Sequence, residues 1–447
     1  MNIKDEESRY MHLSHYTLFL ELGENEGALF NTFSGALSVI PKRAYYSLQG
    51  EFEPRKLSDI FESGSEFIKE KYCCYANEDV EALEQKLLFN KHRKDRLTVT
   101  IMTTLACNLS CVYCYQQGLV DRSLNMTSEV AEKIKIWTIN KIKENKPKEV
   151  IFHFYGGEPL INLDVLEKIM PEIMQAAQSV GAIFTSYVTT NGTLLNQKNI
   201  LRLKRWNLDN AQISIDGPKE IHDVRRPLIN GAGTYDRILE NVVAALKEHL
   251  HVVVRVNIDK QNIVYVEDLF KEMRSRGLNE YRGLQINIEI VSPIMNPTSH
   301  CINYTFNGED EMKALAGLWK MQVEYGFPIK SVMPIDSACE NQIENSYTFS
   351  SNGDMYMCPG FIGIDDFIVG NIMDDDYDNE KYNSLIDKDV WKNCLECEYA
   401  PVCQGGCKMC AYVTQHEFGK TYCRKDFISA IYPEFIKSKY HLAVHNN

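Results

Sequence analysis

The chain has 447 residues, of which 44% are hydrophobic and 24% charged, a composition typical of a globular protein with room for two or three domains. Acidic residues outnumber basic ones 61 to 48, and the resulting net charge of −13 argues against nucleic acid or an anionic membrane as the main partner. The polar start and the lack of a long apolar run predict a cytoplasmic protein without a membrane segment.

Residues 1–92 are expected to form an N-terminal domain with a winged-helix-like α+β composition. Alternating apolar patterns predict a hairpin over 16–21 and 28–33, a third strand over 36–40 and a helix over 79–88. Such a domain can act as a cap on the main domain or as a docking module that adds a peptide as an extra strand. The charged run that follows, residues 91–96, is interpreted as a solvated linker.

From 97 to 300, strands alternate with helical patterns such as those over 165–178 and 235–250. Six strands are predicted, over 97–103, 149–154, 182–188, 211–215, 252–258 and 284–290. Alternation of this kind predicts an α/β fold with a parallel sheet and crossover helices. Six units suit a partial (βα)6 barrel of the TIM type, whose catalytic face lies at the carboxyl ends of the strands.

The last third of the chain is rich in cysteine. After a bridging segment over 301–330, residues 331–430 are expected to form a Cys-rich domain, and 431–447 a C-terminal tail. Eight of the 14 cysteines lie after residue 338, and in a cytoplasmic chain they are expected to serve metal binding or catalysis and not disulfides. By contrast, the pair Cys73 and Cys74 is expected to be buried and inert.

Three cysteines spaced CxxxCxxC, Cys107, Cys111 and Cys114, follow the first barrel strand directly. A cubane iron–sulfur cluster takes four thiolates, so three leave one iron open to a ligand that is not protein. The alternatives are a zinc site or scattered thiols, but structural zinc sites usually supply four protein ligands. The spacing therefore favours a catalytic cluster at the rim of the barrel.

With the aromatic Tyr113 just before the third cysteine, this loop resembles the signature of the radical S-adenosylmethionine (SAM) enzymes. The resemblance implies that Cys107, Cys111 and Cys114 are catalytic, and that the open iron chelates the amine and carboxylate of SAM. Gly156-Gly-Glu-Pro159, directly after the second strand, resembles the motif that holds the SAM amino group.

Further cofactor contacts are expected near the ends of the third, fourth and fifth strands, at Thr190, Asn191, Ser214, Asp216, Arg225, Arg226 and Asn257. Small polar side chains there suit ribose hydroxyls, although Asp216 equally suits a simple turn. The segment with two arginines resembles the one that supplies an arginine to the SAM carboxylate. Either arginine fits that role, and a surface ion pair is the alternative for both.

Seven C-terminal cysteines stand in the order C-x13-G-x4-C, then C-x2-C-x5-C-x3-C, then a last cysteine: Cys339, Cys358, Cys394, Cys397, Cys403, Cys407 and Cys423. This pattern resembles the SPASM domain, which implies two auxiliary [4Fe–4S] clusters. In the family's interleaved order one cluster takes Cys394, Cys397, Cys403 and Cys423, and the other takes Cys339, Cys358 and Cys407.

Some members carry an eighth cysteine a few residues before the position of Cys339, and residues 331–338 contain none. Cys301 or Cys410 could supply the fourth thiolate, but an open site is preferred. An open iron could bind a substrate thiolate, whose pKa falls on metal coordination.

The resemblance implies a radical SAM oxidoreductase with SAM and three [4Fe–4S] clusters, one for SAM and two auxiliary. It also implies an external electron donor of the flavodoxin or ferredoxin kind. The preferred substrate is a ribosomally made precursor peptide with a leader sequence. A 5′-deoxyadenosyl radical abstracts a hydrogen from this peptide, and an intramolecular Cys thioether crosslink forms, as in sactipeptide or ranthipeptide maturation.

Three alternatives remain. An anaerobic sulfatase maturase makes formylglycine, but such enzymes typically carry an aspartate after the cysteine matching Cys358, where this chain has Pro359; Asp354 lies nearby. Another branch of peptide maturases forms carbon–carbon crosslinks. A non-catalytic metal-bound scaffold that only recognises peptides would not need both the Cys107 loop and the Gly156-Gly-Glu-Pro159 turn.

Overall fold

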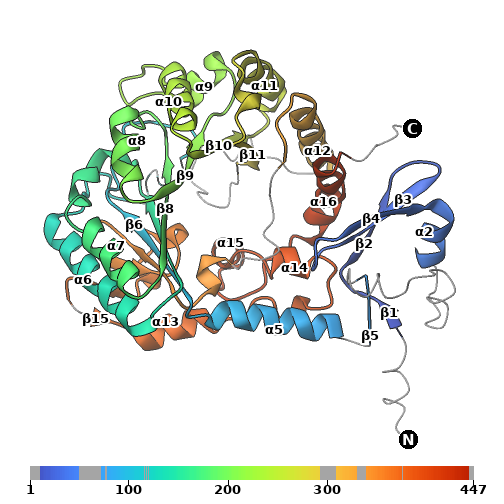
Figure 1. Ribbon diagram of the computed structural model, residues 1–447, viewed down its shortest axis with the longest axis horizontal. Coiled ribbons are helices and arrows are strands. Elements are labelled where there is room, and N and C mark those ends of the chain that lie inside the picture. The colour runs from blue at the N-terminus through green and yellow to red at the C-terminus, as the bar shows by residue number, and fades with distance from the viewer. Residues whose placement is uncertain are drawn as a thin grey trace, which may run out of the picture.

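The computed structural model describes residues 11–49, 72–75, 78–114, 116, 118, 120–291, 309–329, 339–374 and 376–441. Within these residues the strands form one ten-stranded sheet, one three-stranded sheet and one two-stranded sheet. Figure 1 shows the large sheet as the inner wall of an arc, with helices along its outer side. In this part of the chain no helix is both long and apolar enough to cross a membrane.

Six parallel strands pair in chain order and confirm the predicted α/β fold. They are β6 (Arg96–Met102), β7 (Glu149–Tyr155), β8 (Ile183–Thr190), β9 (Leu208–Ser214), β10 (His251–Ile258) and β11 (Leu284–Ile290). The described strands do not close into a barrel, because β11 lies at one edge of the sheet. Apolar residues such as Leu97, Val99 and Ile101 on β6 are fully buried, as expected for a strand covered on its faces.

The outer layer consists of helices that connect or follow these strands. They are α6 (Ser128–Asn145), α7 (Met170–Ser179), α8 (Gln197–Lys204), α9 (Lys219–Arg225), α10 (Tyr235–Lys247), α11 (Val266–Ser275) and α12 (Glu309–Glu324). Thr127 caps α6 by accepting a hydrogen bond from the backbone N–H of Val130. Because the strands are parallel, their carboxyl ends lie together at one rim of the sheet.

The Cys-rich region contributes to the same sheet. Strand β12 (Ser346–Phe349) pairs in parallel with β6, and β13 (Asp354–Tyr356), β14 (Gly370–Asn371) and β15 (Asp376–Tyr377) continue the sheet antiparallel. These strands are too short for a periodic signal in the sequence. The rest of the region is helical, with α13 (Asn379–Ile386), α14 (Ala400–Cys403), α15 (Lys408–Gln415) and α16 (Lys425–Lys439). Residue 430, the expected boundary of the tail, lies inside α16.

The N-terminal region contains the predicted hairpin, third strand and helix. Strands β2 (Thr17–Glu21), β3 (Glu26–Asn31) and β4 (Leu37–Pro41) form an antiparallel sheet. The remaining elements are β1 (Met11–Leu13), α2 (Lys42–Gln49), β5 (Cys73–Tyr75) and α5 (Glu78–His92).

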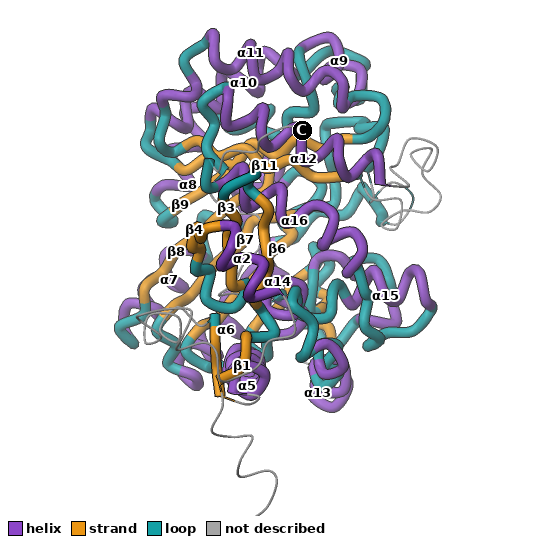
Figure 2. The backbone as a smooth tube through the Cα atoms, turned by 90° about the vertical axis from the view of Figure 1, so that its right-hand side faces the viewer, coloured by secondary structure: helices purple, strands orange, loops and turns teal. Residues whose placement is uncertain are grey.

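This N-terminal sheet packs against the Cys-rich region and α16, as both views show (Figures 1 and 2). The Tyr16 hydroxyl donates to the Leu395 carbonyl at 2.6 Å, and the Thr32 hydroxyl donates to the Glu398 carbonyl at 2.6 Å. The ring of Phe30 meets that of Tyr432 edge-on at 6.1 Å. The N-terminal region is therefore fixed to the far end of the chain.

The interpretation of residues 91–96 as a solvated linker is wrong at Lys91. This residue lies in the last turn of α5 in a buried position, with 5% of its surface exposed, and its ammonium lies 3.1 Å from Asp387 and 3.0 Å from Asp389. Burial acts to lower the pKa of Lys91, but hydrogen bonds to the two carboxylates raise it overall. A run of charged residues is solvent-exposed unless oppositely charged side chains pack against it. Here the two carboxylates are distant in sequence, so the run alone does not predict them.

Candidate active site

The Cys107, Cys111 and Cys114 loop begins at the carboxyl end of β6, and all three thiols are half-buried. Residues 108–112 run antiparallel to residues 225–229, beyond α9. The backbone N–H of Ser110 donates to the Pro227 carbonyl at 2.9 Å, and the N–H of Val112 donates to the Arg225 carbonyl at 3.1 Å. These bonds tie the cysteine loop to the segment that carries the two arginines.

The thiols of this loop already receive hydrogen bonds. The backbone N–H of Leu109 lies 3.4 Å from Cys107 Sγ, and an Arg122 guanidinium N–H lies 3.2 Å from Cys114 Sγ. Burial raises the pKa of the Cys107 thiol, and it raises that of Cys111 to about 11. Hydrogen-bond donors stabilise the thiolate form of a cysteine, and iron binds thiolates. These two donors therefore favour the protonation state that a cluster needs.

The glycines of the Gly156-Gly-Glu-Pro159 turn pack against the cysteine loop itself. The Gly157 N–H donates to the Thr104 carbonyl at 3.0 Å, and a Cβ on Gly157 would lie 2.2 Å from the Ala106 carbonyl oxygen. Gly156 has a φ of +138°, and a Cβ there would lie 2.2 Å from the Thr104 carbonyl oxygen. In the structure the two glycines therefore let two backbones meet, where the sequence suggested a close approach to a ligand.

Glu158 is fully buried and aims its carboxylate at the next strand end. Oε1 accepts hydrogen bonds from the Leu160 N–H at 3.1 Å and the Thr190 hydroxyl at 2.7 Å, and Oε2 accepts one from the Asn191 N–H at 2.7 Å. A carboxylate offers about four acceptor positions, so one remains on Oε2. Burial raises the pKa of Glu158, and these hydrogen bonds oppose the rise. Pro159 opens the short helix Pro159–Val165, and its carbonyl accepts from Thr103.

Thr190 and Asn191 support this turn and the cysteine loop. Both are buried, and besides Glu158 the Asn191 amide donates to Asn108 Oδ1 at 2.8 Å. Its amide nitrogen also lies 3.8 Å from Cys107 Sγ. Both residues thus hold the Glu158 carboxylate, and Asn191 also connects it to the cysteine loop.

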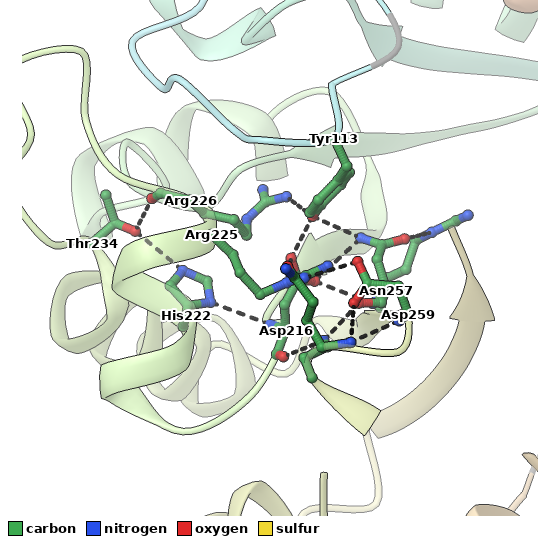
Figure 3. Close-up of polar contacts among 11 residues, drawn as sticks. Tyr113, Asp216, His222, Arg225, Arg226, Thr234, Asn257 and Asp259 are labelled. Atoms are coloured by element: carbon green, nitrogen blue, oxygen red, sulfur yellow. Dashed lines mark hydrogen bonds and ion pairs between the residues drawn. The ribbon is translucent and has the colours of Figure 1, made fainter. Parts of the chain in front are cut away.

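A second network surrounds Tyr113 (Figure 3). The Tyr113 hydroxyl donates to Asp216 and accepts from Arg226 and from the Asn257 amide, the last at 3.1 Å. Asp216 is fully buried, and its Oδ1 accepts from the Asn257 backbone N–H at 3.1 Å. The structure thus joins four predicted residues, while Ser214 ends β9 without a hydrogen bond to the other described side chains.

Both arginines are buried, with 4% and 6% of their surface exposed, so the surface ion pair considered from the sequence is wrong for Arg225 and Arg226. Arg225 donates to Asp259 at 2.9 Å, whereas Arg226 has the Tyr113 phenol as its close partner. The Nε of Arg226 has no hydrogen-bond partner among the described residues. Sequence reasoning missed Asp259, although it stands directly after β10, where polar residues reach the rim.

A cavity of about 400 Å³ lies among β7, β8, β9 and β10. It is lined by His153, Tyr155, Tyr187, Thr189, Asn210, Gln212, Val253 and Pro359. His153 stacks on Tyr187 with ring centroids 4.1 Å apart, and burial lowers its pKa to about 3, so the imidazole is neutral. Sequence reasoning missed this lining, although alternate residues of a barrel strand are expected to face the interior.

The C-terminal cysteines fall into the two predicted sets. Burial raises the pKa of Cys358, and the neighbouring Cys339 and Cys407 thiols raise it further. In the other set, burial raises the pKa of Cys403, and Cys394, Cys397 and Cys423 add to the rise. These mutual effects are consistent with proximity within each set, and the assignment of the two sets to two clusters stays a prediction.

Cys410 lies beside the three-cysteine set, in the first turn of α15. Its hydrogen bond to Cys407 lowers the Cys407 pKa to about 6. Cys301 lies outside the described residues, as does the Cys73 side chain, while Cys74 is buried. No three His, Cys, Asp or Glu side chains in the described residues are arranged to hold a single metal ion. The ligands of a cluster each bind a different iron and need not converge on one point.

Comparison with known proteins identifies the class. Residues 101–273 match the radical SAM superfamily, so the chain carries a radical SAM domain. Among relatives, it is 25% identical over 331 residues to a cysteine-type anaerobic sulfatase-maturating enzyme of Clostridium novyi, which covers 68% of this chain and 85% of the relative.

Solved structures share the fold. Native anSMEcpe with bound AdoMet and Kp18Cys peptide matches with a TM-score of 0.60 and 21% identity, over 77% of this chain and 99% of that one. Streptococcus suis SuiB bound to precursor peptide SuiA matches with a TM-score of 0.52 and 15% identity, over 93% of this chain and 99% of that one. The fold of most of this chain is thus known from solved structures.

Proposed function

We propose that this protein is a radical SAM maturase of a ribosomally made peptide. The observation that carries the proposal is the convergence of the cysteine loop, the Glu158 turn and the Arg226 network at one end of the parallel sheet. A [4Fe–4S] cluster held by Cys107, Cys111 and Cys114, once reduced by an external donor, supplies cleavage of SAM to methionine and a 5′-deoxyadenosyl radical. The surrounding residues bind SAM and exclude water.

The polar groups around the cysteines fit SAM. The remaining acceptor position on the buried Glu158 carboxylate suits the SAM ammonium, because a charged donor repays the cost of burial. Both arginines have buried N–H donors without a hydrogen-bond partner among the described residues, namely Nε of Arg226 and Nε and Nη2 of Arg225, and such donors suit the SAM carboxylate. Arg225 is already neutralised by Asp259, so we assign the carboxylate to Arg226.

Replacing Arg226 should weaken SAM binding selectively. For Arg226→Met we expect the dissociation constant for SAM to rise about 10- to 100-fold, the loss of one charge-assisted hydrogen bond. Binding of methylthioadenosine, which lacks the carboxylate, should change little. Equilibrium dialysis with both ligands measures the difference, and equal losses for the two ligands would contradict the assignment.

A peptide substrate fits two further features. The cavity within the sheet has an uncharged, hydrogen-bonding lining, and Asn and Gln side chains there can both donate to and accept from peptide groups. The three-stranded N-terminal sheet has β2 and β4 at its edges, and a leader peptide could add to an edge as another strand. A chain with net charge −13 suits a basic leader.

For the product we propose an intramolecular Cys thioether. Pro359, which replaces the carboxylate typical of sulfatase maturases, lines the cavity. Cys339, Cys358 and Cys407 would hold one auxiliary cluster, and Cys394, Cys397, Cys403 and Cys423 the other. If the first keeps an open iron, that iron can take the substrate thiolate. If Cys410 closes it, the substrate sulfur must be activated elsewhere.

A second candidate is the making of formylglycine, favoured by the similarity to the Clostridium novyi sulfatase-maturating enzyme. Carbon–carbon crosslinking is a third. Mass spectrometry after coexpression with a short Cys-containing peptide encoded nearby separates them, since a crosslink removes two hydrogens and formylglycine adds an aldehyde. Anaerobically reconstituted protein that forms no 5′-deoxyadenosine from SAM and dithionite would overturn all three.

A further inference from the structure

One arginine contacts the cysteine loop without belonging to either of the polar networks described above. A terminal guanidinium nitrogen of the half-buried Arg122 lies 3.2 Å from Cys114 Sγ, and this is the only hydrogen bond of the Arg122 side chain within the described residues. An arginine side chain stays protonated at any physiological pH. The contact therefore places a permanent positive charge on one of the three thiols of the loop.

The segment around Arg122 is tied to the base of the cysteine loop. The Leu105 N–H donates to the Leu124 carbonyl at 2.9 Å, and the Met126 N–H donates to the Thr103 carbonyl at 2.9 Å. Leu105 and Thr103 directly follow β6, at the point where the loop begins. Backbone pairing thus returns the chain to the loop shortly after Cys114 and brings Arg122 within reach of the sulfur.

The charge of Arg122 is not neutralised by the acid beside it in the sequence. Asp121 Oδ1 accepts hydrogen bonds from the Ser123 N–H at 2.8 Å and from the Ser123 hydroxyl at 2.7 Å. Arg225, by contrast, has a carboxylate partner, because it donates to Asp259 at 2.9 Å. Within the part of the chain that the structure describes, the partner of the Arg122 guanidinium is a cysteine sulfur and not a carboxylate.

We propose that Arg122 raises the reduction potential of the cluster that Cys107, Cys111 and Cys114 would hold. The proposal rests on the proposed function, in which this cluster accepts one electron from an external donor before SAM is cleaved. Reduction adds one negative charge, and a cation hydrogen-bonded to a ligand sulfur stabilises the more negative state. Arg122 therefore makes the cluster easier to reduce.

The other hydrogen bonds to these three thiols, among the described residues, come from neutral groups. The Leu109 backbone N–H lies 3.4 Å from Cys107 Sγ, and the Asn191 amide nitrogen lies 3.8 Å from the same sulfur. Hydrogen bonds with a charged donor are about twice as strong as neutral ones. We therefore assign the effect on the potential to Arg122, as a positioning residue that acts through Cys114.

A redox titration of the anaerobically reconstituted full-length protein tests the proposal. The electron paramagnetic resonance signal to follow is the one that the wild type shows and that the Cys107→Ala, Cys111→Ala, Cys114→Ala variant lacks. For Arg122→Gln and Arg122→Met we expect the ratio of reduced to oxidised cluster, at the midpoint potential of the wild type, to fall about tenfold, which is about 59 mV for one electron. Arg122→Lys keeps the charge and should stay close to the wild type.

Arg276→Gln is the matched control. Arg276 directly follows α11 and pairs with Glu272 at 2.8 Å, so the variant removes the same charge without touching a thiol. The potential of this control should equal that of the wild type.

Three results would overturn the proposal. The first is an unchanged potential in Arg122→Gln. The second is a fall in Arg122→Lys as large as that in Arg122→Gln, because charge would then not be the cause. The third is a loss of about four irons from Arg122→Gln, because the residue would then be needed to hold the cluster. A wild type that lacks the signal, or that forms no 5′-deoxyadenosine from SAM and dithionite, would overturn the proposed function instead.

Discussion

Replacing Gly157 with alanine should remove the SAM-binding cluster while leaving the rest of the chain folded. The new Cβ would lie 2.2 Å from the Ala106 carbonyl oxygen and 2.5 Å from that of Leu105. Backbone cannot rotate away as a side chain can, so the turn and the cysteine loop must separate, at a cost of about 1–3 kcal/mol or more. Iron analysis should show about four irons lost, by the four-iron stoichiometry of a cluster.

Gly317→Ala is the matched control. Gly317 lies in α12, and a Cβ there would meet nothing within 4 Å. The control should keep all iron and gain about 0.5–1 kcal/mol of stability, because glycine is unfavourable inside a helix. Thermal unfolding of the two variants gives the comparison. A Gly157→Ala protein with full iron content and normal SAM cleavage would show that the contact between the turn and the loop is not needed.

The triple variant Cys107→Ala, Cys111→Ala and Cys114→Ala should abolish formation of 5′-deoxyadenosine and retain the auxiliary iron. About eight of roughly twelve irons should remain, since each cluster contains four. Absorbance and iron analysis of the anaerobically reconstituted protein provide the measurement. Cys74→Ala serves as the control, because Cys74 is buried among the N-terminal elements and should leave both iron and SAM cleavage unchanged. SAM cleavage by the triple variant would refute the assignment of the site.

The sequence predicted the six parallel strands well, because each is an apolar run closed by a polar turn. Three residues predicted to lie at the carboxyl ends of the strands, Tyr113, Asp216 and Asn257, come from separate segments and meet in one hydrogen-bond network. Their positions follow from the parallel topology, which puts the carboxyl ends of the strands together.

What the sequence could not supply was contact between distant segments. It left Arg225 and Arg226 equivalent, whereas in the structure Arg225 pairs with Asp259 and Arg226 donates to the Tyr113 hydroxyl. Lys91 read as a solvated charge because its partners, Asp387 and Asp389, lie almost 300 residues away. The close packing of the turn's two glycines against the backbone of the cysteine loop was likewise not predicted. Each case depends on packing that no local pattern encodes.

The parallel pairing of β12 with β6 makes the Cys-rich region a structural part of the radical SAM sheet. Cys107 follows β6 by a few residues and Cys358 follows β13, one strand beyond β12, so a continuous hydrogen-bonded ladder sets the distance between the two cysteine sites. A ladder of this kind has no hinge. The sheet thus fixes the spacing between the Cys107 loop and the turn that carries Cys358.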